Sequence, residues 1–153
     1  MEYLIDTSKQ IRKILFKILE ETPRDLLLEI PKNFNNNIWW NIAHVVVTQQ
    51  LLVYKFSGMP MLVSDTMVEK FKKGTTPDGT ATDEEITEIK TLLFTTLEKT
   101  EEDYKAGNFK NYDAYTTSLN VTINNAVEAM KFNAMHEGIH IGAILALKRN
   151  VSK

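Results

Sequence analysis

Apolar residues recur every three or four positions along much of this chain, which is the spacing of helices that bury one face. Between residues 6 and 21 the pattern is formed by Ile11, Ile14, Leu15, Ile18 and Leu19. Similar spacing and favourable cap residues predict four long helices, near residues 5–21, 37–57, 83–106 and 124–149. Four long helices without a convincing hairpin predict an all-α fold, an antiparallel four-helix bundle, with residues 1–153 as a single domain.

The second predicted helix is the most apolar segment of the chain. Its run of three valines at 45–47 would suit a strand equally well, because β-branched residues favour strands. Length decides for a helix, since about twenty residues without a breaker exceed a typical strand. The segment is apolar nearly all round, so we expect a central, buried helix. The connections at 58–82 and 107–122 are expected to be irregular, with a short helix near 65–72 and a capping box at Thr82.

Composition and charge are those of an ordinary globular protein and exclude several classes of function. Hydrophobic residues make up 43% and charged residues 25%, and the net charge is −2 without a basic stripe. Binding to nucleic acid therefore has no electrostatic support. The absence of cysteine excludes disulfides, thiolate metal ligands and a cysteine nucleophile. The N-terminus lacks the pattern of a signal peptide, and the segment 38–56 is too polar to span a membrane, so we expect a cytoplasmic protein without membrane partners.

The chain has three histidines, and two of them, His136 and His140, lie four residues apart in the last predicted helix. This spacing places both imidazoles on one face, one turn apart, where two nitrogens can bind one metal ion. His44 is the only histidine left to act as a third ligand, which would leave a coordination position open for water or substrate. The alternative is a core histidine satisfied by Thr48 or by a backbone carbonyl. An all-imidazole site favours zinc or nickel.

The sequence from His136 to His140 also matches the HExxH motif of zinc proteases. Those enzymes take their third ligand, a histidine or a glutamate, from downstream, and neither residue type follows His140 here. We therefore discount a zinc protease and expect the third ligand from upstream. Glu137 is a candidate acid/base residue at the edge of the site, although we favour a solvent-facing or supporting position for it.

Three further residues are candidates for the wall of a substrate pocket. Asn41 and Asn133 each precede a predicted ligand by three residues, so either can border a cleft and orient a bound molecule. Trp40 can supply an apolar wall, although an aromatic pair near a helix start more often packs in the core. Small neighbours of the histidines on the last helix, such as Ala143, leave space for such a pocket.

Two motifs resemble those of the DinB/YfiT-like superfamily of metal-binding four-helix bundles. They are NIWWNIAH at residues 37–44 and HEGIHIG at residues 136–142. The resemblance covers nearly the whole chain, and it implies that His44 supplies one metal ligand from the second long helix while the histidine pair supplies two from the last. One departure is that many relatives carry Arg-Gly-Gln directly after the pair, where this chain has Ile-Gly-Ala at 141–143.

The resemblance also implies a class of activity. Relatives include thiol-dependent S-transferases and isomerases, in which a divalent metal activates a low-molecular-weight thiol. The chain is therefore expected to be such a transferase, or a related one, acting on a small-molecule substrate. Two alternatives stay open: a metal-dependent hydrolase, and a metal-binding bundle that serves in stress response without catalytic turnover. The family often forms homodimers, and we expect a homodimer here.

Overall fold

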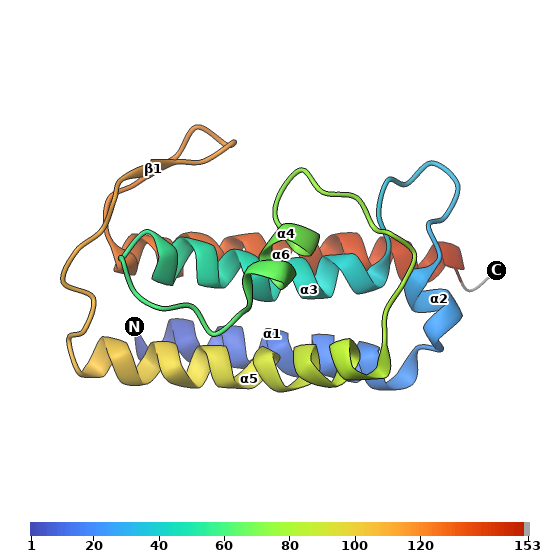
Figure 1. Ribbon diagram of the computed structural model, residues 1–153, viewed down its shortest axis with the longest axis horizontal. Helices are drawn as coiled ribbons and strands as arrows, with labels where there is room; N and C mark the ends of the chain where they lie inside the picture. The colour runs from blue at the N-terminus through green and yellow to red at the C-terminus, as the bar shows by residue number, and fades with distance from the viewer. Residues whose placement is uncertain (152–153) are drawn as a thin grey trace.

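The computed structural model describes residues 1–151 as a bundle of four long helices (Figure 1). These helices are α1 (Glu2–Glu21), α3 (Ile38–Gln50), α5 (Asp83–Lys105) and α6 (Ala126–Val151). The shorter elements are α2 (Arg24–Leu28), the π-helical turn η1 (Leu51–Lys55), α4 (Asp65–Phe71), β1 (Tyr115–Thr116) and β2 (Thr122–Ile123). The predicted all-α fold is confirmed, and apart from the C-terminal end of α3 the ends of the long helices lie within a few residues of their predicted positions.

The four long helices do not alternate in direction along the chain. α3 packs antiparallel to α6, and α1 packs antiparallel to α5, whereas α1 and α6 run in the same direction, as do α3 and α5 (Figure 1). The cause is the long connection over residues 56–82, which returns the chain along the bundle, with α4 inside it, before α5 begins. As a result α3 and α6, which contain all three histidines, are direct antiparallel neighbours.

α3 is the central helix of the bundle, as its apolar composition predicts. Every residue of α3 except Thr48 is buried. The helix begins at the cap residue Asn37, whose side-chain oxygen accepts a hydrogen bond from the backbone N–H of Trp40 at 2.8 Å. Its predicted continuation to residue 57 is only partly α-helical, because the last turn widens into the π-helical η1.

The buried face of α1 differs from the predicted one. Ile14 is 48% exposed, although it belongs to the apolar pattern that predicts the helix. The buried stripe instead includes two polar residues, Ser8 and Arg12. Arg12 can be fully buried because its guanidinium forms an ion pair with a carboxylate on α6. The helix is therefore correctly predicted, but its rotation about its own axis is set by a partner elsewhere in the chain.

The connections contain more regular structure than predicted. The short helix α4 and the capping box of Thr82 with Glu85 are both present where the sequence places them. The second connection, predicted to be irregular, contains a two-stranded antiparallel hairpin in which Tyr115 pairs with Ile123. Its strands have only two residues each, too few to show an alternating pattern. Asn120, with φ of 58°, closes the hairpin in the left-handed conformation that asparagine tolerates.

The buried apolar side chains form two clusters along the bundle. The larger one joins α1, α3, α4 and α5 to the C-terminal half of α6, and the smaller one joins η1 and β2 to the first turns of α6. On α6 the two histidines fall between the residues of these clusters, where the core gives way to polar side chains. None of the helices within residues 1–151 combines the length and the apolar character that a membrane span needs.

Candidate metal centre

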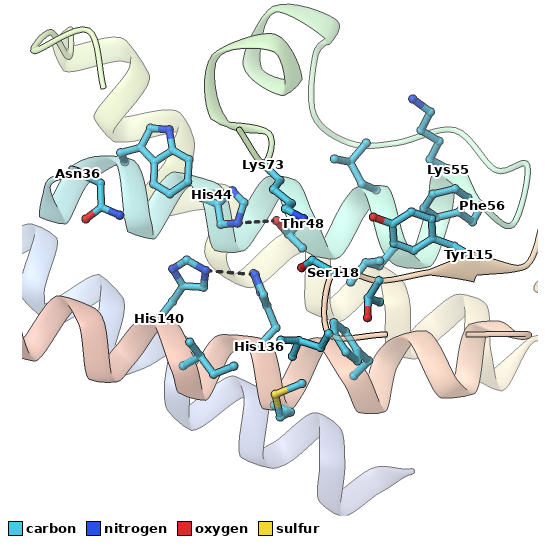
Figure 2. A pocket seen from close by; sticks show the side chains of 18 residues that line it. Asn36, His44, Thr48, Lys55, Phe56, Lys73, Tyr115, Ser118, His136 and His140 are labelled. Carbon is cyan, nitrogen blue, oxygen red and sulfur yellow. Dashed lines mark hydrogen bonds between the residues drawn. The ribbon is translucent and has the colours of Figure 1, made fainter. Parts of the chain in front are cut away.

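The three histidines meet where α3 packs against α6 (Figure 2). One nitrogen from each ring belongs to a group of three atoms that all lie within 4.8 Å of one another. The ring centroid of His44 lies 5.2 Å from that of His136 and 4.8 Å from that of His140. The structure therefore brings the three candidate ligands together, with His44 facing the pair from the opposite helix.

His44 is held by contacts on every side of its ring. Its Nδ1 lies 2.6 Å from the carbonyl oxygen of Phe71, and because a carbonyl only accepts, Nδ1 must be the protonated nitrogen. Nε2 is then unprotonated, and its lone pair accepts a hydrogen bond from the Thr48 hydroxyl at 3.2 Å. The indole of Trp40 stacks on the ring, with centroids 4.5 Å apart and an interplanar angle of 12°. The predicted alternative partners of a core histidine, Thr48 and a backbone carbonyl, are thus both present.

His140 is oriented by a chain of side chains that starts at the cap of α3. The side-chain N–H of Asn41 donates to the backbone carbonyl of Asn37 at 2.7 Å, which fixes the direction of the Asn41 amide. The amide oxygen therefore faces His140 and accepts a hydrogen bond from its Nδ1–H at 2.8 Å. As in His44, the anchored Nδ1–H leaves Nε2 unprotonated and directed at the other histidines.

His136 completes the group through its contact with His140. The Nε2 atoms of these two rings lie 3.1 Å apart, and because His140 Nε2 is the acceptor, the proton between them belongs to His136. The other nitrogen of His136, Nδ1, is buried and has no hydrogen-bond partner within residues 1–151. His136 is thus the least constrained of the three rings, because within residues 1–151 its hydrogen bond to His140 is the one that holds its nitrogens.

Burial lowers the pKa of all three imidazoles. The pKa of His136 falls to about 3, first through burial and then through the nearby charges of His140, His44 and Arg12. Burial and the charge of His44 lower the pKa of His140 to about 4. Burial also lowers the pKa of His44, against the opposing hydrogen bond to the Phe71 carbonyl. The three rings are therefore neutral at neutral pH, which is the form that binds metal.

These residues fit a divalent metal ion. Two of the three rings have an anchored Nδ1–H and an unprotonated Nε2, the arrangement by which proteins orient metal-binding histidines. The separation of 3.1 Å between the Nε2 atoms of His136 and His140 is close to the distance of about 3.3 Å between two nitrogens on one tetrahedral zinc ion. Three neutral donors can hold such an ion and leave room for a further ligand.

Two of the residues predicted for the site lie behind it. Glu137 is fully buried and forms an ion pair with Arg12 of α1, so of its two expected positions the solvent-facing one is wrong, and the carboxylate lies in a supporting position. Asn133 is also buried and donates a hydrogen bond to the same carboxylate at 2.8 Å. Neither side chain lines the cavity that the histidines face. Asn41 likewise does not line this cavity, and it reaches the site only through His140.

The histidines line one end of a cavity of about 530 Å³, a volume in the range of small-molecule sites (Figure 2). Trp40 and Thr48 lie beside them at this end. The rest of the wall comes from α3 and η1, from α6 and from the β1–β2 hairpin, and it is largely apolar. The turn after α4 also contributes to the wall, through Lys73. The sequence does not predict that this turn or the hairpin lines the cavity, because both belong to irregular connections far from the histidine motifs.

The fold and the site together define a helical bundle in which three histidines from two neighbouring helices face an open cavity. The chain belongs to the DinB superfamily, because the model of that family matches residues 8–144. The match spans both histidine-bearing helices and includes all three histidines. A search of curated proteins found none that matches the chain.

Proposed function

We propose that this protein is a metal-dependent transferase of the DinB type, in which a three-histidine divalent centre activates a low-molecular-weight thiol. The observation that supports this most directly is the position of the histidines. They converge at the end of an open, mostly apolar cavity, and in two of the rings the Nδ1–H is anchored by a second partner, so that Nε2 is unprotonated. Membership of the DinB superfamily supports the same class.

His44, His136 and His140 would hold the ion, for which we propose zinc or nickel. A divalent ion on these ligands lowers the pKa of a bound thiol or water, and so supplies a nucleophile at neutral pH. The chain's own residues do the rest. Asn41 and the carbonyl of Phe71 keep two rings aimed at one point, and burial keeps all three imidazoles in the neutral form.

The cavity side chains provide binding and orientation. The Thr48 hydroxyl lies at the wall beside His44, and it becomes available to a substrate atom once the Nε2 of His44 is engaged. Trp40 forms a flat wall over His44, where a reactant can lie against the indole. The apolar far end excludes water from a thiol and an electrophile bound together, which favours transfer between them over hydrolysis.

The test begins with metal analysis of protein purified without an affinity tag. Metal-loaded protein is then given a small thiol with a panel of electrophiles, and thiol consumption is measured. We expect one divalent ion per chain and metal-dependent transfer. His140→Ala should lose metal and turnover together while remaining helical, whereas Lys13→Ala, on the surface of α1, should change neither.

Three outcomes would contradict the proposed transferase. Turnover by metal-free protein, or by His140→Ala, would place catalysis elsewhere. Metal-dependent cleavage of esters or amides without thiol transfer would establish the hydrolase alternative. Stoichiometric metal without any turnover would establish the metal-binding bundle.

A further inference from the structure

The turn that follows α4, residues 72–75, is tied to the histidine site at both of its ends. Before the turn, the carbonyl oxygen of Phe71 accepts the hydrogen bond from His44. At the end of the turn, the Thr75 hydroxyl accepts a hydrogen bond from the indole N–H of Trp40 at 3.0 Å and lies within 3.0 Å of the carbonyl oxygens of Lys70 and Lys72. The backbone of this surface turn is therefore fixed relative to the candidate metal ligands.

Lys73 lies between these two anchors and lines the cavity. Figure 2 shows its side chain reaching the wall beside Thr48 and His44, at the end where the histidines lie. Gly74, with φ of 90°, lets the chain turn away directly afterwards. The Lys73 side chain is thus exposed to solvent, whereas its backbone is held beside the histidines by the contacts of Phe71 and Thr75.

The charge of the cavity is one-sided. Its walls include Lys73 at the histidine end and Lys55, whose side chain rises above Phe56 away from the histidines, whereas no aspartate or glutamate of residues 1–151 lines it (Figure 2). Neither lysine forms an ion pair with another described residue. By contrast, Lys70 and Lys72, next to the same turn, hold carboxylates at 2.8 and 2.6 Å. Of the three lysines in and next to this turn, Lys73 is therefore the one that faces the cavity with its charge unpaired.

The space between the charged positions is apolar. Its walls include Leu52, Phe56, Phe132, Met135 and Ile139. An apolar wall of this size removes a hydrocarbon or aromatic group from water, while a single ammonium at one end favours a negative charge there. The apolar wall and the ammonium together favour molecules that have both an apolar group and a negative charge.

We propose that the cavity binds a small molecule with an apolar body and one anionic group, a carboxylate or sulfonate, which pairs with Lys73. The anionic group lies at the histidine end and the apolar body extends along α6 toward Phe132. This inference rests on the proposed function in one respect, because it treats the cavity as the substrate's route to the metal. The contacts between the bound molecule and the cavity walls do not involve the ion. It names the class of substrate that the transferase would accept.

A pair of fluorescent dyes that differ only in charge tests this directly. Anilinonaphthalene sulfonate has an apolar body and one anionic group, and phenylnaphthylamine is the same body without the sulfonate. The dye titrations use the full chain, freed of metal by a chelator. They are then repeated in the presence of zinc. We expect the sulfonate to bind wild type more tightly than the neutral dye, and Lys73→Met to weaken only the sulfonate, about fivefold.

Matched variants separate charge from shape. Lys73→Arg should restore binding of the sulfonate, and Lys13→Met, on the surface of α1, should leave both dyes unchanged. The position of the dye is read from the methyl resonance of Met135, assigned by its loss in Met135→Leu, which should shift on addition of either dye.

The outcomes are distinct for the two proposals. Equal affinity of both dyes for wild type, an unchanged sulfonate affinity in Lys73→Met, or a Met135 methyl that does not respond would overturn the substrate class. If zinc fails to bind but the dyes discriminate as expected, the metal-dependent function is lost and the cavity's preference for apolar anions stands.

Discussion

Arg12 of α1 and Glu137 of α6 form an ion pair in which both side chains are fully buried. One carboxylate oxygen of Glu137 accepts hydrogen bonds from Arg12 Nη2 at 2.7 Å and Nε at 3.1 Å, and from the Asn133 side chain at 2.8 Å. Glu137 directly follows His136, and successive helical residues point in different directions. The pair therefore holds one side of α6 against α1, which leaves His136 and His140 turned toward α3.

Removing one partner of this pair should strongly destabilise the protein. Arg12→Met leaves the Glu137 carboxylate buried without its cation, and a buried unpaired charge costs about 3–5 kcal/mol. The double variant Arg12→Met/Glu137→Leu should recover much of that loss, because no charge is left unpaired. Urea unfolding monitored by circular dichroism measures both.

The matched control is Lys9→Met on the same helix. Lys9 pairs with Glu101 at 2.6 Å near the surface, where an ion pair contributes under about 1 kcal/mol. If Arg12→Met costs no more than Lys9→Met, the buried pair does not hold α6 as described.

Much of the fold follows from local patterns in the sequence, and the site follows in part. Helical periodicity and caps predict the long helices, because each signal lies within the helix that it specifies. The spacing of His136 and His140 is equally local, and their meeting with His44 follows from the packing of α3 on α6.

The remaining features depend on contacts between distant residues. Arg12 reads as a polar surface position, because its partner Glu137 lies 125 residues away on another helix. Because the partner Arg12 is equally distant in the sequence, Glu137 is not predicted to be buried. Lys73 gives no sequence signal, since its place is set by bonds from Trp40 and His44 to an irregular turn.

Two buried asparagines on either side of the site should differ sharply in their effect on metal binding. Asn41→Leu removes the acceptor for His140 Nδ1–H, so zinc affinity should fall about 10- to 100-fold, the usual effect of losing a partner of a metal-binding histidine. Asn133→Leu removes a contact of Glu137 and none of a histidine, so zinc affinity should change much less. Competition with a chromophoric chelator measures both affinities. Equal losses in the two variants would show that Asn41 acts on the fold and not on the ligand.

The metal-free protein should lose stability as the pH falls below neutral. Folding lowers the pKa of His136 from 6.5 to about 3 and that of His140 to about 4, so the unfolded chain binds more protons between those values. The free energy of unfolding is then at its full value above about pH 6.5 and decreases as the pH approaches about 4.

Urea unfolding in the presence of a chelator, from about pH 7.5 to about pH 5, tests this dependence. His136→Asn/His140→Asn removes both groups and should flatten the curve, leaving the part due to His44 and to carboxylates. A double variant that loses as much stability as wild type over this range would assign the pH dependence to other groups.

The stacking of Trp40 on His44 should make tryptophan fluorescence a reporter of metal binding. The two rings lie 4.5 Å apart, so a nickel ion on His44 is within the short range at which its open d shell quenches an excited indole. Titration of metal-free protein with nickel should therefore quench the emission until the site is saturated. Trp40→Phe should lose most of this response. Trp39→Phe should keep it, because the Trp39 ring packs edge-on against Phe71 at 5.6 Å and does not touch a histidine. A response that survives in Trp40→Phe and disappears in Trp39→Phe would place the bound nickel away from His44.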